Sequence, residues 1–209
     1  MELSAQTPVT DDVWIQQASK GDLDAFNQLV LAYQNMAYRH AYALLGDPAL
    51  AEDATQESFI KAFQAMDRFR GGSFRGWLLK IVTNSAYDLL RRDRKHPAQP
   101  LFPEDENGEE LESPAWLFDP ASSVQDAVER NDLTRELNQL LRKLPEVYRS
   151  VLLLVDVDEL DYSEAAQALN VPIGTVKSRL ARARLQMQRK LKARIHYSDC
   201  IEPASCLAV

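Results

Sequence analysis

The sequence of 209 residues contains only two cysteines, Cys200 and Cys206, and both lie in its last ten residues. A disulfide framework therefore does not organise the body of the chain. The sequence also lacks any stretch that approaches the roughly 18 consecutive apolar residues of a membrane span. Its first twelve residues lack the basic start and apolar run of a signal peptide, so we expect a cytoplasmic protein.

Strand patterns and catalytic motifs are missing as well. Because no segment alternates apolar and polar residues, we predict an all-α protein with two small helical domains. The predicted folded parts lack a phosphate-binding glycine loop, a paired nucleophile and base, and metal-ligand spacing, so we expect no enzyme activity, cofactor or metal. In the tail, His196, Cys200 and Cys206 leave a zinc or redox role open, although they are fewer than a closed zinc site needs. A flexible tail is the simpler interpretation.

The net charge of −7, taken alone, argues against a nucleic-acid-binding protein. The charge is unevenly distributed, however. Residues 61–95 carry 9 basic and 3 acidic side chains, and residues 161–209 carry 8 and 4, whereas the rest of the chain is acidic. Two basic blocks indicate polyanion binding at two places. We also expect the acidic segments to compete with phosphate, so that the free chain binds DNA poorly.

Apolar residues recur with a helical period in two parts of the chain. The first part begins with a long amphipathic helix that ends at Gly46-Asp47-Pro48, and His40 on its apolar face is expected in core or interdomain packing. We predict a flexible N-terminus at 1–11, a first domain at 12–95, an acidic, proline-rich linker at 96–123, a second domain at 124–194 and a tail at 195–209.

A short helix, a turn and a longer helix are predicted within residues 161–192. Ser163 is a good N-cap for the short helix, and Asn170 can adopt the left-handed conformation that precedes a tight turn. This order is typical of a helix-turn-helix DNA-binding unit. The apolar residues of the longer helix share one face, which we expect to be buried: Val176, Leu180, Ala183, Met187 and Leu191.

The other face of the longer helix is basic near its start, where an arginine can bind a guanine edge in the major groove. A solvated basic face is the alternative. The motifs at 144–149, 162–166 and 174–184 resemble region four of the extracytoplasmic-function, or group IV, sigma factors, which give bacterial RNA polymerase its promoter specificity. The resemblance implies that the minus-thirty-five promoter element is bound by Thr175, Lys177, Ser178, Arg179, Arg182 and Arg184, the last of these on phosphate.

Residues 51–63 are similar to the segment of region two that docks on the clamp helices of the polymerase β′ subunit. Its polar residues fall on successive turns of one helix face, which makes a polar docking strip. Without the resemblance, a merely solvated helix face is the favoured explanation, because such faces are the default on globular helices. The polymerase-binding residues that the resemblance implies are Glu52, Asp53, Gln56, Glu57, Phe59 and Lys61.

Residues 69–92 look like the minus-ten recognition and melting segment of the same family. Opening DNA requires a pocket for an unstacked base, and this segment offers backbone groups, a hydroxyl and an aromatic ring. We expect Trp77 mainly in the core, because its spacing places it on the apolar face. The implied strand-binding residues are Phe69, Arg70, Gly71, Gly72, Ser73, Phe74, Arg75, Asn84, Asp88, Arg91 and Arg92.

The resemblance implies a sigma factor that binds core RNA polymerase through the β′ clamp helices and the β flap. Promoter-specific initiation in a stress or envelope response, and an anti-sigma partner, are further implications. The residues alone leave two alternatives open: a freestanding helix-turn-helix regulator that uses only the second domain, and an adaptor that binds protein partners. A dimer with a palindromic target would favour the regulator.

Overall fold

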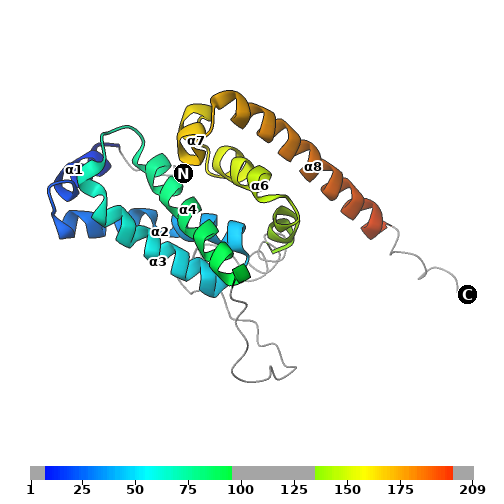
Figure 1. The fold of residues 1–209 in the computed structure, drawn as a ribbon, viewed down its shortest axis with the longest axis horizontal. Coiled ribbons are helices and arrows are strands. Elements are labelled where there is room, and N and C mark those ends of the chain that lie inside the picture. Colours follow the sequence, from blue (N-terminus) through cyan, green and yellow to red (C-terminus); the bar gives the residue numbers. More distant parts are fainter. Residues whose placement is uncertain (1–7, 96–134, 200–209) are drawn as a thin grey trace, which may run out of the picture.

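A computed structural model describes residues 8–95 and 135–199, and within these ranges the chain forms helices and no strand, as predicted (Figure 1). The first unit consists of α1 (Pro8–Ala18), α2 (Leu23–Leu45), α3 (Pro48–Gln64), the 3-10 turn η1 (Met66–Arg68) and α4 (Phe74–Lys95). The second unit consists of helical residues 135–142, α6 (Glu146–Leu152), the π-helical turn η3 (Leu153–Val157), α7 (Tyr162–Leu169) and α8 (Ile173–Asp199). None of the helices described is long and apolar enough to span a membrane.

Local capping sets the boundary between α2 and α3. The side chain of Asp22 caps the start of α2, and Gly46 ends the helix with a φ of 74°, in the left-handed region. Asp47 then caps α3, whose first position, Pro48, needs no backbone donor there. The helix end that we predicted at these residues is confirmed.

The core of the first unit lies where α2, α3 and α4 pack against one another, with α1 against α2. Leu29, Leu44 and Leu78 are fully buried in it, and each such side chain stabilises the fold by about 1.5–3 kcal/mol relative to an exposed position. Phe26 and Phe63 add an edge-to-face contact between α2 and α3, with ring centroids 5.0 Å apart. This packing holds α3 and α4 side by side and fixes the surface between them.

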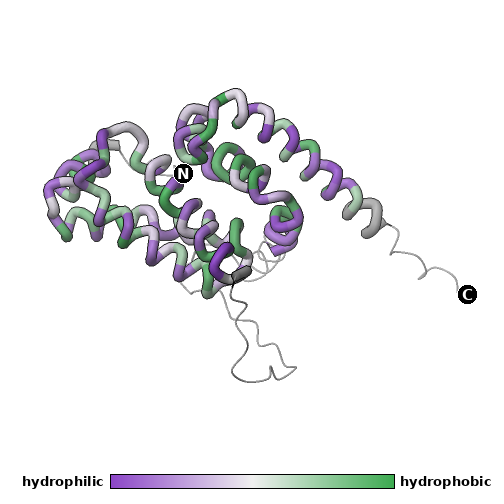
Figure 2. The backbone as a smooth tube through the Cα atoms, viewed as in Figure 1, coloured by the Kyte–Doolittle hydropathy of each residue, from purple (hydrophilic) through white to green (hydrophobic). Residues whose placement is uncertain are grey.

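The second unit packs α6 against α8, with α7 beside both. Figure 2 shows a hydrophobic stretch where α6 passes into η3, at residues 151–155, whereas α8 alternates between hydrophilic and hydrophobic residues. The predicted buried face of α8 is confirmed for Val176, Leu180, Ala183 and Met187. Leu191 is 38% exposed, so its predicted burial is wrong, because α8 runs beyond the body of the unit (Figure 1).

The structure also moves three predicted boundaries. Helix α1 begins at Pro8, within the N-terminus that we expected to be flexible, and α8 continues to Asp199, within the expected tail. The N-cap of α7 is Asp161 rather than Ser163. The Asp161 carboxylate accepts hydrogen bonds from the backbone of Ser163 and Glu164, and the Glu164 carboxylate accepts one from the Asp161 N–H at 2.9 Å. This reciprocal capping box satisfies more backbone donors than a hydroxyl at Ser163.

The predicted linker at 96–123, Cys200, Cys206 and the side chain of His196 lie outside the described residues. The two units nevertheless pack directly on each other, since α4 contacts α7 and α2 contacts α6. His40 is 2% exposed, and its Nδ1 lies 2.6 Å from Oδ2 of Asp158 in the second unit. The expectation of core or interdomain packing for this histidine is confirmed.

Candidate nucleic-acid interface

The loop that joins η1 to α4, residues 69–73, is named the strand loop here. Gly71 and Gly72 have φ values of +87° and +88°, which residues with a side chain rarely adopt. The hydroxyl of Ser73 accepts a hydrogen bond from the backbone N–H of Gly76 at 3.0 Å and so begins α4. The strand loop therefore has a defined path although most of its residues are exposed.

Three aromatic rings lie at the inner side of the strand loop. The centroid of Phe69 is 5.3 Å from that of Trp77 and 5.9 Å from that of Phe74. Phe74 is buried, whereas Phe69 and Trp77 are partly exposed. Trp77 packs against the core on one side, as predicted, and also lines a cavity beside the loop. Phe69 and Trp77 are therefore within reach of a ligand, and Phe74 supports them from below.

The buried side of this cluster is closed by Tyr33 of α2. Its ring lies 5.2 Å from that of Phe74, and its hydroxyl donates a hydrogen bond to Asp11 Oδ2 at 2.8 Å. Burial and the Asp11 carboxylate raise the pKa of Tyr33, so the phenol keeps its proton and remains a donor. This contact ties α1 to the helix under the strand loop.

The cavity beside the strand loop has a volume of about 280 Å³. Trp77 and three cationic side chains, Arg68, Arg70 and Lys80, line it from the first unit. Residues of α7 line it from the second unit. Cations pair with phosphates and aromatic rings stack on bases, so the first-unit wall suits a single-stranded nucleotide.

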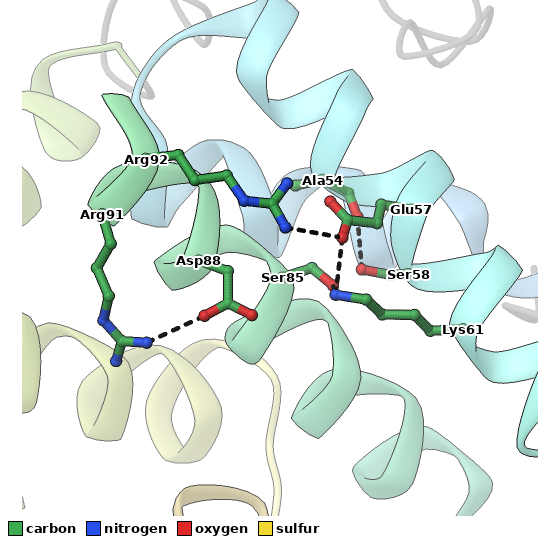
Figure 3. Close-up of polar contacts among 8 residues, drawn as sticks. All are labelled: Ala54, Glu57, Ser58, Lys61, Ser85, Asp88, Arg91 and Arg92. Atoms are coloured by element: carbon green, nitrogen blue, oxygen red, sulfur yellow. Dashed lines mark hydrogen bonds and ion pairs between the residues drawn. The ribbon is translucent and has the colours of Figure 1, made fainter. Parts of the chain in front are cut away.

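Further strand-binding candidates continue along α4. Asn84, Asp88 and Arg91 follow Lys80 at intervals of three or four residues, which places them on one side of the helix. Arg91 donates a hydrogen bond to Asp88 Oδ1 at 3.0 Å, and both side chains are exposed or half-buried (Figure 3). Arg92 turns toward α3 instead.

Arg75 does not join these candidates. It is half-buried and lines a second cavity, of about 160 Å³, together with His40 and Asp158. The structure therefore directs Arg75 toward the contact between the two units rather than toward the strand loop.

The polymerase-binding candidates on α3 divide into two groups. Glu52, Asp53 and Gln56, which we name the docking strip, are exposed. Glu57 and Lys61 are tied to each other by a 2.8 Å ion pair and to α4, since Lys61 Nζ donates to Ser85 Oγ at 3.0 Å (Figure 3). Arg92 lies 4.0 Å from the same Glu57 carboxylate oxygen. These contacts fix the edge of the docking strip against α4.

Phe59 is 8% exposed and packs in the core, so it supports the docking strip from beneath and offers little surface to a partner. Two neighbours that we did not single out as binding residues are more accessible. Ile60 is 59% exposed and Phe63 is 39% exposed on the same helix. The signal in the sequence was an apolar residue one position after each buried one, Phe59 and Ala62, where a helical period expects polar residues.

The recognition candidates on α8 lie at its first three turns. Lys177, Ser178 and Arg182 are exposed, whereas Thr175 and Arg179 are half-buried. Asn170 adopts the predicted left-handed conformation, with a φ of 52°, at the turn before α8. Lys177 Nζ lies 5.8 Å from the ring centroid of Tyr162, a cation–π contact that orients the start of α8 against α7.

Arg184 differs from the other recognition candidates because it has an ionic partner within the chain. Its Nε and Nη2 donate hydrogen bonds to the carboxylate of Asp156 in η3, at 3.0 Å and 2.6 Å. This interaction raises the pKa of Arg184, and both side chains remain partly exposed. The sequence did not reveal Asp156, since 28 residues separate the pair.

Two family descriptions match the chain: Sigma-70 region 2 over residues 29–96, and Sigma-70 region 4 over residues 134–187. Among similar proteins is the ECF RNA polymerase sigma factor SigW of Bacillus subtilis, which is 36% identical over 179 residues. That comparison covers 85% of this chain and 95% of SigW.

Two solved structures have a similar fold. CnrH, in complex with the cytosolic domain of CnrY, has a TM-score of 0.63 and 26% identity, over 88% of this chain and 98% of CnrH. The sigma factor RpoE of Bartonella quintana, in complex with the anti-sigma factor NepR, has a TM-score of 0.61 and 28% identity. It covers 81% of this chain and 98% of RpoE.

Proposed function

Because the chain belongs to the extracytoplasmic-function family of RNA polymerase sigma factors, we propose that it divides promoter recognition between its two units. The first unit docks on core polymerase and captures the melted strand at the minus-ten element. The second unit reads duplex DNA at the minus-thirty-five element. We assign the chain to group IV of the sigma-70 family, acting in the cytoplasm, where its polymerase works.

The observation that carries the proposal is the combination found at the strand loop. A defined glycine loop, two accessible aromatic rings and three cations surround one cavity. An extruded base loses stacking worth a few kcal/mol, and stacking on Phe69 or Trp77 returns about 1–3 kcal/mol per base. Arg91 extends the cationic surface along the strand.

Upstream recognition rests on α8. Arg182 is exposed on the second turn after Thr175 and belongs to a helix whose opposite face is anchored by Val176 and Leu180. An exposed arginine on a rigid helix can bind a guanine edge through two hydrogen bonds. The basic side chains beyond it serve as phosphate contacts that set the register.

Core polymerase binds the docking strip on α3, with the exposed side chain of Ile60 beside it. The chain supplies binding energy for DNA opening and has no catalytic activity of its own; nucleotide addition belongs to the polymerase. By analogy with CnrH and RpoE, whose structures contain CnrY and NepR, we propose an anti-sigma partner for this chain. A freestanding regulator would not need the docking strip.

In vitro transcription with purified core polymerase and genomic promoter fragments tests the proposal. The chain is expected to bind core polymerase and direct initiation at discrete start sites. Asp53→Arg reverses a charge in the docking strip and should weaken core binding, while Asp12→Arg makes the same change on α1 and should not. Failure of the unmodified chain to bind core polymerase or to initiate would overturn the proposal.

A further inference from the structure

The second cavity, of about 160 Å³, shares no lining residue with the cavity beside the strand loop. A cavity of about 150 Å³ is large enough for a molecule of the size of benzene, so this one accommodates a ligand of about six or seven heavy atoms. Its wall combines apolar and charged side chains from α2, α4 and the segment of η3 with its C-cap: Met36, Arg39, His40, Ala43, Arg75, Leu153, Val157 and Asp158.

The negative charge of Asp158 is balanced within the cavity wall. The hydroxyl of Thr83 donates its one proton to the Leu79 carbonyl at 2.7 Å, so His40 Nε2 is the donor in its 2.9 Å contact with Thr83. A proton also lies between His40 Nδ1 and Asp158 Oδ2, because two lone pairs do not approach to 2.6 Å. Wherever that proton sits, the His40–Asp158 pair carries no net charge.

The two arginines in the wall are not balanced in this way. Neither Arg39 nor Arg75 has a carboxylate within 4.0 Å in the described parts of the chain. The Nε of Arg75 is buried, and no acceptor within residues 8–95 and 135–199 bonds to it. A buried charged donor gains most from a charged acceptor, so this N–H is the strongest anion-binding group of the cavity.

The chemistry of the wall selects among anions. A guanidinium binds a carboxylate or a phosphate, but Met36, Ala43, Leu153 and Val157 offer no hydrogen bonds from their side chains to the further oxygens of a phosphate. A carboxylate has only two oxygens, and an attached aliphatic stem can cover these apolar side chains. Arg39 is exposed and Val157 is 56% exposed, so such a ligand can enter past them.

We propose that this cavity binds a carboxylate on a short apolar stem, with the carboxylate on Arg75 and Arg39 and the stem against Met36, Leu153 and Val157. Two sources carry this chemistry: a free short-chain carboxylic acid, and a glutamate side chain of a partner protein. The inference is independent of the proposed function, because it depends only on the cavity and its side chains.

Nuclear magnetic resonance of the full-length, nitrogen-15-labelled chain tests the proposal through the Nε–H signal of Arg75, which is assigned by its loss in Arg75→Gln. Pentanoate is the probe for a free acid, and an acetylated and amidated Leu-Glu-Leu tripeptide is the probe for a glutamate side chain. Pentanamide lacks the charge, and inorganic phosphate lacks the stem. All titrations are made at constant ionic strength.

Pentanoate or the tripeptide is expected to shift the Arg75 Nε–H signal in a saturable manner, and the probe that binds more tightly identifies the source. Pentanamide should give no saturable shift, and phosphate should bind more weakly than the better probe. Absence of a saturable shift with both carboxylate probes would overturn the proposal. Tighter binding of phosphate than of either carboxylate would overturn it as well.

Variants locate the binding through the backbone amide signal of Ala43. Arg75→Gln should weaken binding of the better probe by about tenfold or more, as expected for a lost charged hydrogen bond. Val157→Glu should also weaken it, because a second carboxylate then stands at the cavity. Both variants have matched controls that should bind like the unmodified chain: Lys20→Gln removes an exposed cation elsewhere, and Leu137→Glu adds a carboxylate at another exposed apolar position. Unchanged affinity in Arg75→Gln would show an adventitious site and overturn the proposal.

Discussion

Asp156 accepts two hydrogen bonds from Arg184, and this pair joins η3 to the side of α8 that we propose for DNA binding. Paired guanidinium and carboxylate groups neutralise each other, so Arg184 contributes less positive charge to the surface than its neighbours do. The availability of Arg184 for phosphate therefore depends on Asp156. The pair is partly exposed, and pairs of that kind contribute at most about 1 kcal/mol to folding.

Asp156→Asn should increase the affinity of the chain for duplex DNA of any sequence, because Arg184 loses its counter-charge. The slope of log affinity against log salt should steepen by about one unit. The same substitution in an Arg184→Ala chain is the control and should leave the slope unchanged. An equal change in both chains would mean that Asp156 acts only through the net charge.

Arg182→Ala should weaken discrimination between the minus-thirty-five element and scrambled duplex by about 1–3 kcal/mol. Competition binding of holoenzyme to the two duplexes measures this difference. Arg189→Ala is the matched control, since Arg189 is exposed two turns further along α8. Equal loss on both duplexes would show that Arg182 contacts only phosphate.

Arg91→Ala should lower the salt dependence of promoter binding by the holoenzyme by about one unit of slope. Its ion pair with Asp88 is exposed, so the loss should hardly change the free energy of unfolding. Lys20→Ala removes a cation outside both basic blocks and should leave the slope as it is. A slope that does not respond to Arg91→Ala removes Arg91 from the phosphate contacts.

Asp161→Ala should lower the free energy of unfolding by about 0.5–2 kcal/mol, because α7 loses its N-cap. Ser163→Ala should change it by less than about 0.5 kcal/mol, as its hydroxyl does not cap the helix. Urea unfolding followed by circular dichroism compares the two chains. A larger cost for Ser163→Ala would contradict the capping box at Asp161.

Helix type and helix ends were predictable where a few adjacent residues decide them. Gly46, Asp47 and Pro48 end one helix and begin the next through their own backbone and side-chain chemistry. Val176 and Leu180 were assigned to a buried face by spacing alone. The sequence alone does not separate Ser163 from Asp161 as the cap of α7, because both residue types suit that position and only the reciprocal bond from Glu164 distinguishes them.

Features that depend on contacts between residues far apart in the chain could not be predicted from the sequence. His40 was expected in core or interdomain packing, but its partner Asp158 is 118 residues away, and no local pattern connects them. Leu191 fits the apolar period of α8, yet it is exposed, because burial requires another helix packed against that part of α8. The burial of Phe59 could not be predicted either, since it depends on which side of α3 the other helices cover.

Gly46 of the first unit and Arg142 of the second unit are in contact, so related sequences could show whether other members of the family share this contact between the units. A Cβ at position 46 would lie 2.2 Å from Cδ of Arg142, which itself donates a hydrogen bond to the Gly46 carbonyl at 3.1 Å. Homologues that share the arrangement should therefore vary the two positions together, with a shorter side chain at 142 wherever 46 is not glycine. Such covariation would be evidence that the contact between the two units is shared among homologues.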